Sequence, residues 1–265
     1  MGVRRATERD AYRAFIAAKW TANQPACIND AVISERLFAF QRAVVSFALR
    51  LGRSAVFLDT GLGKTPIELE WARIVAEYTG KPALILAPLA VAQQTAREGQ
   101  KFGIDVTVAR SGEDVTGPGV YVANYERLHL FDQVDVGGVA LDESSILKSF
   151  DGKTRTTLIA RFAHTPFRLA ATATPAPNDH MELGNHAEFL GVMRGNEMLS
   201  RFFVNDTSTA SQSWRLKKHA VGSFWRWVAS WSRFAAMPSD LGFDDDGFDL
   251  LPLEEKTHIV RHDHG

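Results

Sequence analysis

In the stretch VFLDTGLGKTPIEL, residues 56–69, an apolar strand runs through two glycines into Lys-Thr and then a helix. Glycines let backbone N–H groups approach phosphate oxygens, and the start of a helix adds a favourable dipole. Lys64 is therefore predicted to hold the β- and γ-phosphates of a nucleotide, and the Thr65 hydroxyl to ligate Mg²⁺. Leu58 stands where the pattern G-x-x-x-x-G-K-[ST] has its first glycine, which leaves open a glycine-rich turn that only caps an ordinary helix.

Short apolar stretches alternate with helical ones from residue 37 to about residue 191. This alternation predicts an α/β fold, a parallel sheet with helices on its faces. The apolar stretches are nearly continuous, as expected when both faces of a sheet are covered. The predicted strands are residues 54–60, 82–88, 105–110, 119–124, 138–143 and 167–173. The predicted helices are residues 38–51, 65–78, 91–102, 154–162 and 179–190.

An acid pair follows one of the predicted strands, in the sequence GVALDESS of residues 138–145. Ligands bind at the carboxyl edge of a parallel sheet, where Asp142 and Glu143 would emerge. Asp142 is predicted to hold Mg²⁺ through water, and Glu143 to orient and deprotonate an attacking water. The alternative is a solvated acidic turn.

The composition is that of a globular protein, with 45% hydrophobic and 23% charged residues. Lys and Arg number 30 against 31 Asp and Glu, so any nucleic-acid-binding surface must be local. Cys27 is the single cysteine, which excludes an internal disulfide and a zinc site built on several thiolates. The sequence has no signal peptide and no apolar run long enough for a bilayer, so a cytoplasmic location is expected.

Four motifs occur in a fixed order: DTGLGKT, LAP, LDESS and LAATATP. They resemble the ordered motifs of superfamily 2 helicases and translocases, above all the Swi/Snf-type branch and phage-encoded DEAD/DEAH-like helicases. In LFAFQRAVV, Gln41 stands where this family uses a glutamine to read the adenine edge. The resemblance covers residues 37–190 and implies a RecA-like P-loop lobe with ATP and Mg²⁺ as cofactors. If a phage encodes the chain, the expected location is the cytoplasm of its bacterial host.

The resemblance also implies a role for each matching residue. The residues expected to bind ATP are Gln41, Thr60, Gly61, Leu62, Gly63, Lys64 and Thr65, and the expected catalytic residues are Lys64, Asp142 and Glu143. Pro88 and the helix after it would meet a nucleic-acid backbone, with Lys148 as the lysine that trails the acidic motif. Thr172 and Thr174 would couple the γ-phosphate to that surface. Such contacts carry little sequence preference.

Two departures from the family pattern matter. Ser144 and Ser145 stand where the family often has Ala-His, which weakens a relay to the nucleic-acid side. The family's catalytic site also lies between two RecA-like lobes, and the second lobe supplies arginine fingers. Residues 250–265 resemble the lead-in to that lobe, so either the chain is a fragment or the second lobe comes from elsewhere. The isolated chain is expected to hydrolyse ATP poorly.

The flanking segments differ in composition from this lobe. Residues 1–36 are predicted to form a helical extension, residues 191–240 a basic helical appendage, and residues 241–265 an acidic linker. The appendage has seven Lys/Arg against three acids and four of the six tryptophans. Its residues Phe224, Trp227, Trp231 and Phe234 have helical spacing and are predicted to pack on the lobe, whereas Trp225 could face a partner lobe. Lys217 and Lys218 are either DNA contacts or part of a solvated basic face.

These features support one main function and two alternatives. The main hypothesis is the N-terminal motor lobe of an ATP-dependent helicase or translocase, with DNA favoured over RNA. An ATP-binding switch that acts through a partner without real turnover is the alternative. A P-loop enzyme of another class, such as a kinase, lacks an evident acceptor site.

Overall fold

The computed structural model describes residues 26–148, 152–176, 179–206 and 213–248. Its main strands are β1 (Arg53–Leu58), β2 (Pro82–Ala87), β3 (Val106–Val108), β4 (Gly119–Asn124), β5 (Gly138–Asp142), β6 (Phe167–Ala171) and β9 (Ser232–Ala235). They form one sheet in the order β3-β4-β2-β5-β6-β1-β9, and every pairing in it is parallel. Six of these strands coincide with the predicted ones, which confirms the α/β fold.

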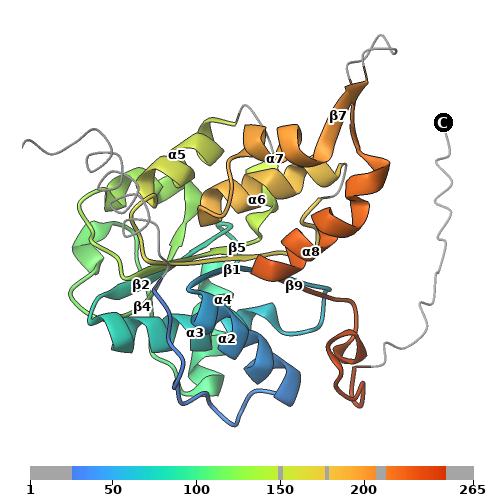
Figure 1. Cartoon of the computed structure of the whole chain (residues 1–265). Helices are drawn as coiled ribbons and strands as arrows, with labels where there is room; N and C mark the ends of the chain where they lie inside the picture. Colours follow the sequence, from blue (N-terminus) through green and yellow to red (C-terminus); the bar gives the residue numbers. More distant parts are fainter. Residues whose placement is uncertain (1–25, 149–151, 177–178, 207–212, 249–265) are drawn as a thin grey trace, which may run out of the picture.

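Helices cover both faces of this sheet and complete three layers (Figure 1). One face carries α2 (Ala39–Leu51), α3 (Lys64–Thr79) and α4 (Ala92–Phe102). The other carries α5 (Lys153–Arg161), α6 (Leu183–Leu190), α7 (Gly195–Phe202) and α8 (Val221–Trp231). Successive residues of β1 point alternately into the two cores: Val56 and Leu58 into the first, Ala55 and Phe57 into the second. All six residues of β1 are buried, which accounts for the apolar run of its last four, whereas Arg53 and Ser54 at its start are buried polar residues.

Residues 191–240 contain more than the predicted helices. Helices α7 and α8 are present, but β7 (Phe203–Asp206) and β8 (Ser213–Leu216) form an antiparallel hairpin that projects from the helical layer (Figure 1). Strand β9 then pairs with β1 in the main sheet. The sheet therefore takes its last strand from the segment that was predicted to be an appendage.

Phe234 lies on β9 and not on the helix that its spacing predicts. Helix α8 ends at Trp231 because Ser232 turns to an extended conformation and its hydroxyl donates to the carbonyl of Val228 (2.7 Å). Because β9 follows α8 directly and is only four residues long, the apolar residues of both elements have nearly helical spacing in the sequence. The pattern of hydrophobic residues therefore could not locate this boundary.

The ends of the described region pack on the sheet's first helical layer. The Phe248 ring meets the rings of Phe38 (5.0 Å between centroids) and Phe40 (5.2 Å), so the start of the predicted acidic linker lies against α2. Residues 1–25 of the predicted helical extension and residues 249–265 of the predicted linker lie outside the described residues. Within the described ranges, no helix has the length and apolarity needed to cross a membrane.

Candidate functional site

The carboxyl ends of β1, β6 and β5 meet at one rim of the sheet, and a predicted site segment follows each strand. The register pairs Val56 with Ala171 and Ala171 with Asp142, so these residues form one row across the sheet. The glycine loop starts three residues after Val56, Thr172 follows Ala171, and Glu143 follows Asp142. Neighbouring strands are about 4.8 Å apart, which places β5 roughly 10 Å from β1. The structure therefore brings the predicted phosphate loop and the acid pair to the same rim.

The loop between β1 and α3 has a backbone that needs glycine. Gly61 and Gly63 have φ angles of 91° and 72°, in the left-handed region that other residues rarely adopt. The Lys64 ammonium donates to the carbonyl oxygens of Leu58 (2.9 Å) and Asp59 (3.2 Å), so it lies over its own loop. These two carbonyls accept the hydrogen bonds of the lysine in the described structure.

Gln41, in the first turn of α2, binds the loop between β1 and α3 through its side-chain amide. Its Nε2 donates to the carbonyl of Leu62 (3.1 Å), and its Oε1 accepts from the backbone N–H of Phe38 (3.0 Å). A Cβ at Gly63 would lie 2.3 Å from Nε2, so the loop and the buried amide fit closely. Gln41 thus positions the loop, and its contact with adenine stays a prediction.

The acid pair lies in a strained turn. Glu143 has a φ of 57°, the one positive value among the non-glycine residues that the structure describes. That conformation costs about 1–2 kcal/mol, so the surrounding contacts must fix it. Oε1 of Glu143 accepts hydrogen bonds from the hydroxyls of Ser145 (2.6 Å) and Thr172 (2.8 Å). The Thr172 hydroxyl in turn accepts from the backbone N–H of Thr174 (3.0 Å), which links the residues after β5 and β6.

Asp142 shares this environment with Lys64. Burial raises the pKa of the Asp142 carboxyl, the charge of Glu143 raises it further, and the Lys64 ammonium opposes both effects. The Tyr125 hydroxyl donates to the backbone carbonyl of Asp142 (2.8 Å) and so anchors the end of β5. An ammonium, two carboxylates and a hydroxyl bonded to one of them therefore share one region of the rim.

A third acid, Glu68, lies one helical turn after Lys64 on α3 and was not predicted as a site residue. Its side chain is fully buried, and in the described part of the chain neither carboxylate oxygen has a hydrogen-bond partner. Burial raises its pKa well above the ordinary value, and the charges of Asp142 and Glu143 add to this rise. Its spacing of four residues from Lys64 was the available signal, because positions i and i+4 share a helix face.

We expect Glu68→Met to stabilise the protein by about 1–3 kcal/mol at pH 7, because it removes a buried polar group without a partner. A carboxyl whose pKa is raised on folding stabilises the fold below its unfolded pKa of 4.5 and loses this effect as the pH rises. The gain in the free energy of unfolding from Glu68→Met should therefore shrink as the pH falls toward 4.5, as measured by urea unfolding. Glu70→Met is the matched control. Glu70 is equally buried on α3 but binds Arg73, so its replacement should destabilise.

A second missed residue is His186 on α6. It is fully buried behind the acid pair, with Nε2 3.1 Å from the hydroxyl of Ser144. Burial lowers the pKa of the imidazole from 6.5 to about 4. The ring is therefore neutral in the folded protein at neutral pH.

This shift predicts acid sensitivity. The unfolded chain takes up a proton at His186 below about pH 6.5, whereas the folded protein does so only near pH 4, so stability is lost across this window. The free energy of unfolding should fall by about 3 kcal/mol across it. Urea unfolding between pH 7.5 and 4.5 should show a smaller loss for His186→Gln, which cannot titrate. Parallel curves for the two proteins would contradict the prediction.

The rim continues beyond the acid pair toward β2, β4 and β3. Pro88 follows β2 there, next to exposed Leu89. Arg110 and Arg127, which the sequence analysis did not single out, follow β3 and β4 and are exposed. With Asn124 they line a cavity of about 180 Å³. This part of the rim is cationic and lies on the same edge of the sheet as the phosphate loop.

The three predicted lysines have different surroundings. Lys148 is exposed at the end of η3 (Ser144–Lys148). The Lys217 ammonium donates to the carbonyls of Ser200 (2.8 Å) and Arg201 (3.2 Å) at the end of α7, where a cation is favourable. Lys218 is exposed on η5 (Lys218–Ala220). Lys217 therefore has a structural task in the fold, which makes it a weaker candidate for nucleic acid than the other two.

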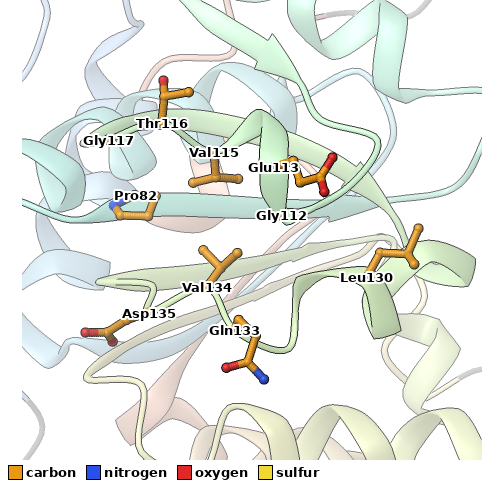
Figure 2. Close-up of a pocket in the computed structure, with 10 residues that line it drawn as sticks. All are labelled: Pro82, Gly112, Glu113, Val115, Thr116, Gly117, Leu130, Gln133, Val134 and Asp135. Carbon is orange, nitrogen blue, oxygen red and sulfur yellow. The ribbon is translucent and has the colours of Figure 1, made fainter.

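A larger cavity, of about 600 Å³, opens near the opposite edge of the sheet (Figure 2). Its lining includes Pro82 at the start of β2 and the acids Glu113 and Asp135. None of the predicted site residues lines it. Cavity size therefore does not identify the candidate site, whereas the convergence of charged residues at the carboxyl rim does.

Comparison with known proteins gives relatives of limited similarity. No protein-family model matches the chain. Protein p41 of Acyrthosiphon pisum secondary endosymbiont phage 1 is 29% identical over 255 residues, covering 83% of this chain and 53% of p41. The Sulfolobus solfataricus SWI2/SNF2 ATPase core in complex with dsDNA has a TM-score of 0.63 and 18% identity, covering 77% of this chain and 45% of that one. The Pyrococcus furiosus Hef helicase domain has a TM-score of 0.50 and 19% identity, covering 62% and 39%.

The chain spans about half the length of p41 and of the SWI2/SNF2 core. Both solved structures are similar in fold, and they agree with the seven-stranded parallel sheet and its two helical layers. The chain thus shares its α/β fold with the Sulfolobus SWI2/SNF2 ATPase core and the Hef helicase domain.

Proposed function

We propose that this chain is the N-terminal motor lobe of an ATP-dependent DNA helicase or translocase. It binds Mg–ATP and the nucleic-acid backbone, and it hydrolyses ATP together with a second RecA-like lobe. The observation that carries this proposal is the meeting of Lys64, Asp142, Glu143 and Thr172 at one rim of a parallel sheet. A phosphate-binding loop next to a paired acid is the arrangement that ATP hydrolysis needs.

The residues at the rim fit a triphosphate and its cation. No atom lies within 4 Å of a Cβ built at Gly61, so the loop is open on that side. The backbone of residues 60–65 and the Lys64 ammonium would hold the phosphates. The Thr65 hydroxyl and the Asp142 carboxylate are oxygen ligands of the kind that Mg²⁺ takes. When bound, the cation would stabilise negative charge that develops on the phosphoryl oxygens.

Glu143 is the proposed base. Both hydrogen bonds to its carboxylate in the described structure end on Oε1, which leaves Oε2 as the oxygen to orient a water and accept its proton. Thr172 and Thr174 tie this carboxylate to the loop after β6. A movement of that loop would therefore reorient the base, which is the coupling role proposed for both threonines.

The cationic rim is the proposed contact for nucleic acid. Pro88, Arg110 and Arg127 lie at the ends of β2, β3 and β4, with exposed Lys148 at the end of η3. The two guanidinium groups and the Lys148 ammonium suit phosphates and not base edges, so binding should depend on salt and little on sequence. The dsDNA in the Sulfolobus complex supports duplex DNA as the first substrate to test.

An ATP-binding switch without real turnover is the second candidate. The bonds from Lys64 to the carbonyls of Leu58 and Asp59 fit this candidate, because they give the lysine a role in holding the loop that does not require ATP turnover. Here the chain would bind ATP and signal to a partner.

The two candidates differ in ATP turnover with and without duplex DNA. We expect the chain to hydrolyse Mg–ATP slowly, with a rate that rises at least severalfold when DNA is added at low salt. Mg–ATP binding without turnover in either condition would favour the switch. A chain that does not bind Mg–ATP at all would exclude both.

A further inference from the structure

The turn that carries Glu143 is held from behind by α6. Oγ of Ser144, the next residue, lies 3.1 Å from Nε2 of His186, and both side chains are fully buried. At the other end of η3, the carbonyl of Lys148 accepts from the side-chain amide of Asn185 (3.1 Å). Two successive residues of one helix therefore hold the two ends of the segment that follows the acid pair.

The surroundings of His186 determine which way its hydrogen bonds run. Nδ1 lies 3.4 Å from the backbone carbonyl of Glu182, and a carbonyl can only accept. We therefore assign the proton to Nδ1, which leaves Nε2 to accept from the Ser144 hydroxyl. The edge of the imidazole meets the Phe57 ring of β1 at 5.2 Å between centroids. His186 thus contacts the strand before the phosphate loop as well as the turn after β5.

We propose that His186 is a positioning residue for Glu143, acting through the hydroxyl of Ser144. The inference rests on the proposed ATP hydrolysis. Glu143 has the one left-handed backbone among the described non-glycine residues, so the direction of its side chain depends on how firmly the neighbouring residue is fixed. Ser145 and Thr172 fix the carboxylate at Oε1, and the Ser144–His186 bond fixes the backbone behind it. Removing that bond should disturb the base without touching the phosphate loop.

The test compares four variants of the full chain: His186→Leu, His186→Gln, Ser144→Ala and the double variant His186→Leu/Ser144→Ala. Single-turnover ATP hydrolysis should fall about 10-fold in His186→Leu and in Ser144→Ala, the size typical of a lost supporting hydrogen bond. The double variant should be no slower than either one, because both changes remove the same bond. The His186→Gln variant keeps a polar group near the serine, so it should recover most of the rate. His219→Leu, on exposed η5, controls for the loss of a histidine.

Two further measurements separate positioning from general damage. The Kd for Mg–ATP should stay within about twofold in all variants, because the loop is unchanged. In ¹⁵N-histidine spectra, the Nε2 resonance of His186 should move in Ser144→Ala, since it loses its donor. A wild-type rate in His186→Leu, additive losses in the double variant, or a matching loss of Mg–ATP affinity would overturn the inference.

Failure of the proposed function gives a different result. In that case wild type itself would show no ATP hydrolysis, with or without duplex DNA. The ¹⁵N shift would then report only a structural hydrogen bond, and His186 would have no positioning role. Hydrolysis by wild type together with an unaffected His186→Leu would overturn the inference and leave the proposed function standing.

Discussion

Lys64→Ala is expected to weaken Mg–ATP binding by at least about 100-fold. The Lys64 ammonium lies over the loop, bonded to the carbonyls of Leu58 and Asp59. A charge-assisted hydrogen bond from it to each of two phosphates would contribute about 1.5–3 kcal/mol. Loss of even one such bond is worth roughly a factor of 10 or more, and loss of both exceeds 100. Titration calorimetry with Mg–ATP measures the effect directly.

The control for this variant is Lys81→Ala. Lys81 lies at the opposite edge of the sheet, where its ammonium pairs with Asp135 on the surface (2.6 Å). That substitution removes the same charge and should leave the affinity for Mg–ATP unchanged. Thermal unfolding of both variants would show that each is folded. Equal binding of Mg–ATP by wild type and Lys64→Ala would contradict the assignment of the phosphate loop.

Glu143→Gln is expected to slow ATP hydrolysis by about 100- to 10,000-fold, the range for loss of a general base. The glutamine oxygen can still accept from Ser145 and Thr172, so the turn and its link to β6 should persist. What is lost is the oxygen that would accept a proton. Mg–ATP affinity should stay within about threefold of wild type, because the loop that holds the phosphates is unchanged.

Rapid-quench measurement of single-turnover hydrolysis, together with calorimetric binding, distinguishes this result from simple loss of binding. The opposite pattern is expected of Lys64→Ala, which should lose binding first. If Glu143→Gln hydrolysed ATP at the wild-type rate, the base would have to be another residue. Asp142 would then be the nearest candidate at the same rim.

The sequence predicts the centre of the fold well for a physical reason. Strands buried on both faces are mostly apolar, so β1, β2, β4, β5 and β6 stand out as short, largely apolar runs between polar or glycine-containing loops. Because the strands are parallel, residues that follow them gather at one rim. The meeting of the phosphate loop with the acid pair could therefore be expected before any coordinates.

The features that the sequence could not give depend on contacts between distant segments. Strand β9 has four residues, and the neighbour that makes it a strand is β1, whose paired residues lie 177 positions earlier. His186 looks like any polar residue of a helix until α6 is placed behind Ser144. Arg110 and Arg127 become neighbours only because β3 pairs with β4. Lys217 is a further example. A run of basic residues in a sequence does not show which of their ammonium groups will bind the carbonyls at the end of a helix.

The pairing of β9 with β1 sets the minimum length of a usable fragment. Residues 55–58 pair with residues 232–235, and the N–H of Asp59, at the entrance to the phosphate loop, donates to the carbonyl of Ala235 (2.9 Å). A truncation at residue 190 would strip this cover from β1 and turn it into a bare edge that other chains could join. It would also expose apolar side chains that α8 now shields, so such a fragment should self-associate on expression. Any shortened version of the lobe should therefore extend past Ala235.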